Sequence, residues 1–213
     1  MYHRILFTFL TFFLVYSCAV KKEIPQQFEG KLVYQLSGRM ITKGAPDSTD
    51  IQIVYAKDSL LRVESFTNIG KQVYIKHIPK NRAYILMDLG GQKVAIQTIP
   101  EPSPNAGKYI FQPKRKRKTF AGQRANSVEV KIPNIDSTFS MFYLPHISPE
   151  YSEAIPGIAG LPVKYTIFSN DELIDYELIE FDEKTINRDL FGIPSDHQII
   201  TMDDFIQMIQ EGN

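Results

Sequence analysis

The chain has 213 residues, with 24 basic and 24 acidic side chains, 43% hydrophobic residues and one cysteine. A net charge near zero provides no long-range field that attracts nucleic acid, and a single cysteine cannot form an internal disulfide. The composition therefore excludes a nucleic-acid partner and a disulfide-stapled scaffold, and it suits one domain stabilised by packing.

The chain begins with the layout of a secretory signal peptide. Residues 1–4 carry one positive charge and no acid, and residues 5–16 form an almost uninterrupted apolar run. A membrane-spanning helix needs about 20 apolar residues, whereas this run ends earlier, at Ser17. The pattern predicts a signal peptide over residues 1–17.

Residues 14–18, LVYSC, resemble the bacterial lipobox, with an aliphatic residue three positions before the cysteine and a small residue next to it. The resemblance implies cleavage before Cys18 and acylation of its thiol and of the new amino group. Each buried methylene contributes about 0.8 kcal/mol, so several chains on one residue give durable membrane attachment. The alternative is an ordinary signal peptide with a cysteine nearby, although a free thiol is unusual in an oxidising compartment.

The mature chain would begin with Cys18 followed by Ala19, without the aspartate that retains lipoproteins at the inner membrane of enteric bacteria. The resemblance thus implies an outer-membrane lipoprotein, on the periplasmic face or the cell surface. Residues 18–27 are polar and lack periodicity, which predicts a tether that reaches about 30 Å at ~3.3–3.6 Å per residue.

The pattern changes to a period of two at Phe28, which predicts strands with one buried face. In residues 28–40 the even positions are mostly apolar, and Gly30 and Gly38 on this face indicate bends or close backbone approach. The other alternating segments are residues 51–55, 61–63, 73–75, 83–87, 94–96, 128–132, 139–143, 163–167 and 176–180.

Short turn sequences separate these segments, so we expect an antiparallel meander rather than crossover helices. A long first strand that contains glycines further predicts strong curvature. The expected fold is mainly β: a curved antiparallel sheet, or half-barrel, forming a single domain over residues 28–213.

Two segments have helical patterns, and we expect both to pack on the concave side of the sheet. In residues 201–213 the apolar side chains follow the spacing i, i+3, i+4 and i+7, and Thr201 can cap the start. Residues 148–155 predict a short helical turn, with Ser148 as cap and Pro149 in the first position. The apolar side chains of the first segment are Met202, Phe205, Ile206 and Ile209.

The proline-rich residues 99–120 interrupt the alternation and predict a loop that covers the sheet as a flap. Within it, the sequence PNAGK lacks the first glycine of a phosphate-binding loop, and Tyr109 stands where that motif needs Ser or Thr. A phosphate-binding loop is therefore excluded.

No constellation of catalytic or metal-binding residues is present in the sequence. His77, His146 and His197 remain after processing, without the spacing of a zinc site, and the acidic pair Asp203 and Asp204 suits the start of a helix. We therefore expect no catalytic residue, no metal and no cofactor.

The strongest charge feature is KRKRK, formed by Lys114, Arg115, Lys116, Arg117 and Lys118. One interpretation is a contact site for anionic groups such as lipid phosphates or sulfated sugars. The other is a solvated strand edge, in which charges on both faces prevent further strand pairing. The sequence favours the second interpretation and leaves the first open.

The order of features resembles the envelope lipoproteins whose fold is similar to the carriers and receptors of the Lol lipoprotein pathway. The resemblance rests on the lipobox, the first strand FEGKLVYQ, the hairpin KTFAGQRANSVEVKI, the segment GIAGLPVKYTI and the closing DLFGIPSDHQI before a terminal helix. It implies a half-barrel with an apolar concave site, and it transfers no catalytic residue.

Three functional hypotheses follow. The first is a non-enzymatic lipoprotein that binds a lipid or another apolar ligand in the concavity of the sheet. The second is a structural or protein-interaction module whose apolar faces form a solid core. The third is an enzyme, which would require His146, His197 or an acidic pair to converge in a cleft.

Overall fold

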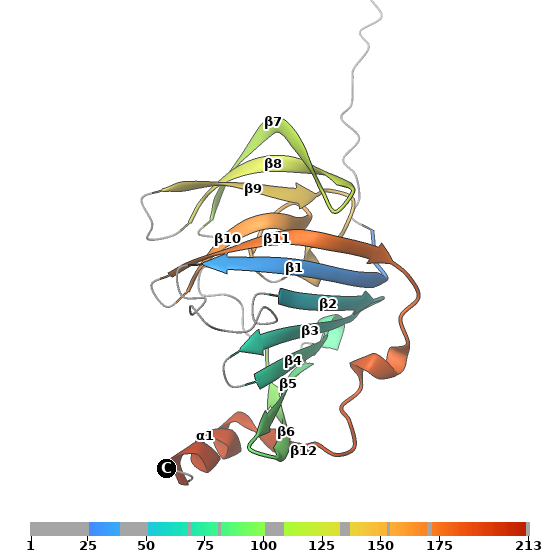
Figure 1. The fold of residues 1–213 in the computed structure, drawn as a ribbon, viewed down its shortest axis with the longest axis vertical. Helices are drawn as coiled ribbons and strands as arrows, with labels where there is room; N and C mark the ends of the chain where they lie inside the picture. Colours follow the sequence, from blue (N-terminus) through green and yellow to red (C-terminus); the bar gives the residue numbers. More distant parts are fainter. Residues whose placement is uncertain are drawn as a thin grey trace, which may run out of the picture.

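A single sheet of twelve strands organises the chain in the computed structural model, which describes residues 26–38, 51–67, 70–80, 82–100, 109–132, 137–152, 154–169 and 172–211 (Figure 1). The strand order is β12-β6-β5-β4-β3-β2-β1-β11-β10-β9-β8-β7. The strands are β1 (Gly30–Gly38), β2 (Ile51–Lys57), β3 (Leu60–Thr67), β4 (Gly70–His77), β5 (Arg82–Leu89), β6 (Gln92–Thr98), β7 (Ile110–Phe120), β8 (Gln123–Lys131), β9 (Thr138–Leu144), β10 (Leu161–Ser169), β11 (Glu172–Glu183) and β12 (Gln198–Thr201).

Four helical segments accompany the described part of the sheet. They are three short 3₁₀ helices and one α-helix: η2 (Ile78–Lys80), η3 (Pro149–Tyr151), η4 (Arg188–Phe191) and α1 (Met202–Glu211). The expected mainly-β fold, a curved and largely antiparallel sheet with a C-terminal helix, is confirmed. None of these helices is long and apolar enough to cross a membrane.

Strand β1 lies in the middle of the sheet, where it pairs with β2 on one side and with β11 on the other. The strands from β2 to β6 extend the sheet from one edge of β1, and those from β11 back to β7 extend it from the other. The one parallel pair among the described strands joins β12 to β6, and the sequence did not reveal it.

Gly30 occupies a point of close backbone approach, as the sequence indicated. A Cβ atom at this position would lie 2.2 Å from the carbonyl oxygen of Asp182 and 2.7 Å from the Cζ atom of Phe28. Only glycine fits here without displacing the neighbouring strand β11. The sheet also carries a register shift between Val33 and Tyr34, which adds local twist.

The prediction of a loop over residues 99–120 is wrong for residues 110–120, which form strand β7. Proline is tolerated there because β7 is an edge strand, so the missing N–H of Pro113 costs no central ladder bond. The register shifts between Pro113 and Arg117, and the turn to β8 uses positive φ at Ala121 and Gly122. The PNAGK sequence lies outside the described residues.

The two faces of the sheet can be assigned from the register. Leu32, Val54 and Val63 lie directly opposite one another on β1, β2 and β3, and they belong to the main core on the concave face. Val73 and Ile75 point to the other face, where Phe191 of η4 packs on them. Thus η3 packs on the concave side, as expected, whereas η4 covers the opposite face.

Helix α1 lies on the concave side at the β6–β12 end of the sheet (Figure 1). Phe205 and Met208 pack on a cluster formed by Val94, Ile96 and Ile200. The expected apolar stripe is buried only in part, because the helix covers only the last two strands of the sheet. Three of its side chains stay 39–46% exposed: Met202, Ile206 and Ile209.

Both expected helix caps are present. The Oγ1 atom of Thr201 donates to the Oδ2 atom of Asp204 at 2.7 Å and accepts from the Asp204 backbone N–H at 3.2 Å. The Oγ atom of Ser148 accepts from the backbone N–H of Glu150 at 3.3 Å. These side chains satisfy N–H groups that a helix start leaves without internal partners.

Candidate functional site

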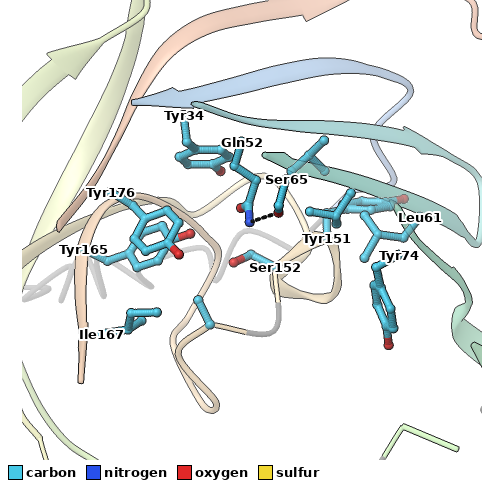
Figure 2. A pocket seen from close by; sticks show the side chains of 13 residues that line it. Tyr34, Gln52, Leu61, Ser65, Tyr74, Tyr151, Ser152, Tyr165, Ile167 and Tyr176 are labelled. Atoms are coloured by element: carbon cyan, nitrogen blue, oxygen red, sulfur yellow. Dashed lines mark hydrogen bonds between the residues drawn. The ribbon is translucent and has the colours of Figure 1, made fainter. Parts of the chain in front are cut away.

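A pocket of about 300 Å³ opens on the concave face beside η3 (Figure 2). Strands β1, β2, β3, β4, β10 and β11 supply most of its wall, and the segment around η3 supplies the rest. Its lining combines five tyrosines with aliphatic and small polar side chains: Tyr34, Gln52, Val54, Leu61, Val63, Ser65, Tyr74, Tyr151, Ser152, Ala154, Tyr165, Ile167 and Tyr176.

Three of the tyrosines form an aromatic wall. The rings of Tyr165 and Tyr176 stack with centroids 4.8 Å apart and planes 6° apart. Tyr34 meets Tyr165 edge to face, with centroids 5.9 Å apart and an interplanar angle of 71°. Such pairs stabilise one another beyond simple burial, so the three rings form a fixed surface on one side of the pocket.

Hydrogen bonds to the backbone hold two of the tyrosines in place. The Tyr34 hydroxyl donates to the carbonyl oxygen of Pro162 at 2.9 Å. The Tyr151 hydroxyl donates to the carbonyl oxygen of Asp58 at 2.8 Å and accepts from the Phe28 backbone N–H at 3.1 Å. Because these hydroxyls are used by the fold, both residues present mainly ring carbon to the pocket.

The polar part of the lining lies next to this wall. The Gln52 Nε2 atom donates to the Ser65 Oγ atom at 3.3 Å, across the pair of strands β2 and β3, where the two residues are directly opposite (Figure 2). Ser152, which follows η3, adds a second hydroxyl. These groups can donate and accept hydrogen bonds without carrying charge.

The pocket tyrosines are held in their neutral form. Burial raises the pKa of the Tyr34 and Tyr176 phenols, and it raises that of Tyr165 well above its ordinary value although a hydrogen bond with Ser152 acts in the opposite direction. Desolvation also raises the pKa values of Tyr74 and Tyr151. The cause throughout is that an apolar environment disfavours the phenolate.

The lining therefore offers aromatic faces, aliphatic side chains, hydroxyls and one amide. None of the described lining residues carries a carboxyl, imidazole or thiol group. This set of groups is suited to binding an amphiphilic or apolar molecule, with a few hydrogen bonds to orient it. The volume lies at the low end of the range for ligand pockets, about 300–1,000 Å³.

The residues that the sequence singled out lie away from this pocket. Cys18, the predicted signal peptide and most of the predicted tether lie outside the described residues. The basic run of Lys114–Lys118 lies on the exposed edge strand β7, and β8 and β9 separate it from β10. Lys114 pairs with Glu129 at 2.7 Å, and the Lys118 Nζ atom lies 4.9 Å from the centre of the Phe120 ring.

The three histidines do not converge. His77 lies at the end of β4, His146 lies in the turn after β9, and His197 precedes β12, where its Nδ1 atom contacts the Asp196 Oδ1 atom at 2.8 Å. No group of three or more potential metal ligands gathers within the described part of the chain. Asp204 caps α1 and takes no part in the pocket.

Sequence reasoning located the concave face but missed the tyrosines as a set. They come from four strands and one 3₁₀ helix, so no spacing in the sequence joins them. The available signal was the placement of Tyr34, Tyr165 and Tyr176 on the apolar faces of alternating segments. That pattern does not distinguish a lining residue from a core residue.

Comparisons with known proteins give a fold but no family. No protein-family model matches the chain, and no curated protein sequence matches it. A structure of PNGF-II in the P21 space group is similar, with 11% identity and a TM-score of 0.50 over 85% of this chain and 33% of that one. A second, in the C2 space group, has 12% identity and a TM-score of 0.43, covering 85% and 32%.

This chain therefore spans about a third of the length of the PNGF-II chains. At such low identity, the likeness in the first comparison concerns the course of the sheet alone.

Proposed function

We propose that this chain is an outer-membrane lipoprotein, anchored through acyl chains on Cys18, that binds the apolar or acylated part of a ligand in the concave pocket. The proposal is for binding without chemical conversion, and it requires no cofactor. The pocket, with its wall of neutral tyrosines beside aliphatic side chains, is the observation that carries it.

The resemblance to the carriers and receptors of the Lol pathway agrees with this proposal, because such a fold uses an apolar concave site. The anchor rests on the lipobox sequence of residues 14–18. The alternative, an interaction module with a solid core, predicts a filled concave face, and the cavity of about 300 Å³ weighs against it.

Lipid analysis of protein purified without detergent tests the proposal. The full chain carrying Cys18→Ala is purified, extracted with organic solvent and examined by mass spectrometry, so that no covalent anchor contributes to the signal. We expect a bound acyl lipid in a stoichiometric amount.

Two matched variants locate the lipid. Ser65→Phe adds a ring inside the pocket, whereas Ser140→Phe adds one at an exposed position of β9. The first should lose the lipid and the second should retain it, with equal denaturation midpoints showing that both are folded. Protein without any lipid, or equal lipid in both variants, would overturn the proposal.

A further inference from the structure

A second hollow, of about 680 Å³, lies on the same face between the pocket and helix α1. Its lining includes Ile85 of β5, Ile99 just after β6, and Met202 at the start of α1. Ile99 is 69% exposed and Met202 is 39% exposed, which is unusual for large apolar side chains in one concave place.

Tyr74 belongs to the walls of both hollows. It lies on β4, with three strands between it and the β11 residue Tyr176, so it marks the opposite side of the first pocket (Figure 2). Its half-buried ring is therefore the boundary between the tyrosine-lined pocket and a second space whose lining is mainly aliphatic, with Gln97 and Thr98 beside it.

The two hollows are joined by one row of side chains that crosses the sheet. The register places each member directly opposite the next, and all of them face the concave side: Val54, Val63, Tyr74, Ile85 and Ile96. Ile96 is buried under α1 and lines neither hollow, so the open part of the row runs from Val54 to Ile85. Neighbouring strands are about 4.8 Å apart, so these three steps cover roughly 14 Å of apolar surface. A row of this length fits a ligand with an extended acyl chain better than a compact ligand.

Polar side chains line both hollows: Thr98 and the exposed Gln97 belong to the second, and Gln52 and Ser65 belong to the first. Gln52 and Ser65 form the neighbouring row on β2 and β3, two residues along each strand from Val54 and Val63. No charged side chain is among the described residues that line either hollow. Because an unpaired charge is costly to desolvate, the half-buried and hydrogen-bonded pair of Gln52 and Ser65 suits an uncharged polar group.

Resting on the proposed function, we propose that the ligand is an elongated, single-chain amphiphile with an uncharged head. The head contacts Gln52 and Ser65, and the acyl chain passes Tyr74 into the second hollow, beside the start of α1. The ligand is bound without chemical conversion. What is proposed is its class and the path of its acyl chain.

Monoacylglycerols of increasing acyl length are the probe, titrated against the full chain carrying Cys18→Ala. We expect about fourfold tighter binding per added methylene, the ratio that corresponds to ~0.8 kcal/mol, up to the length that fills the second hollow. Fatty acids of equal length should bind more weakly above their pKa. Carboxylates that bind as well as monoacylglycerols would overturn the uncharged head.

Substitutions in the second hollow test the path. Ile99→Glu and Met202→Glu should weaken binding of long chains at least tenfold and leave short chains unaffected. Ile179→Glu, at a position on β11 that is 50% exposed and faces away from the hollow, is the matched control and should change neither. Equal chain-length dependence in all three variants would overturn the inference.

The two proposals predict different results. Suppose that short and long probes bind equally to the chain carrying only Cys18→Ala, and that adding Ser65→Phe abolishes the binding of both probes. The extended path is then wrong and the pocket proposal stands. If no probe of any length binds, both proposals are wrong.

Discussion

The rings of Tyr165 and Tyr176 lie parallel across neighbouring strands, with centroids 4.8 Å apart, because the register of β10 and β11 places the two residues directly opposite. Tyr34, on the next strand, meets this stack edge to face. Three strands thus combine to present one aromatic surface at the pocket, and its rigidity follows from the register of the sheet.

The first prediction concerns the anchor. Cys18→Ala should abolish incorporation of labelled fatty acid and release the protein from the membrane fraction, since each buried methylene contributes about 0.8 kcal/mol to attachment. Metabolic labelling and fractionation check this. Unchanged membrane partitioning of the variant would count directly against lipidation, and Ser17→Ala, which keeps a small residue before the cysteine, should behave as the parent.

A second prediction concerns the buried hydroxyl of Tyr34. Tyr34→Phe removes the donor to the Pro162 carbonyl and leaves that buried acceptor without its partner, so unfolding free energy should fall by about 1–3 kcal/mol. Urea denaturation measures the loss. Tyr143→Phe, at a half-exposed position on β9, should change stability by less than ~0.5 kcal/mol. An equal effect of both substitutions would contradict the assignment.

Gly30 provides a third test, based on space. Gly30→Ala places a Cβ atom 2.2 Å from the Asp182 carbonyl oxygen, so β1 and β11 must separate locally. Overpacking of this kind costs roughly 1–3 kcal/mol or more of unfolding free energy. Gly38→Ala, whose nearest atom would be the Leu173 carbonyl oxygen at 3.1 Å, should cost clearly less. Thermal denaturation of the two variants gives the comparison.

The neutral tyrosines imply a fourth result, a loss of stability in alkaline solution. Burial raises the folded-state pKa of Tyr34, Tyr165 and Tyr176 above the ordinary value of 10.0. Above pH 10 the unfolded chain loses these protons while the folded chain keeps them, so stability is full below pH 10 and falls above it. Tyrosinate absorbance from these residues should rise together with unfolding. Complete titration near pH 10 in a folded protein would contradict this.

The fold was accessible from the sequence where one face of a strand is buried. The alternation in residues 51–55 or 128–132 predicts a strand because a period of two separates a core face from a solvent face. The same reasoning failed at β7, where charged side chains point to both faces of an exposed edge. It also missed β12, whose four residues are too few for a periodic signal.

The site was less accessible than the fold. Gln52 and Ser65 meet because β2 and β3 pair in one register, and neither residue has a sequence pattern that marks it. Whether the concave face was filled or hollow depended on the volumes of side chains from six strands and on the position of η3. Such a sum of volumes is a property of the folded sheet rather than of any segment.

Equilibrium binding of a fluorescent acyl probe tests the central claim most directly. The chain carrying Cys18→Ala should bind one probe per molecule, and adding Ser65→Phe should weaken binding at least tenfold while Ser140→Phe leaves it unchanged. Probe binding that is absent from the parent, or that is equally strong after the pocket is filled, would contradict the account.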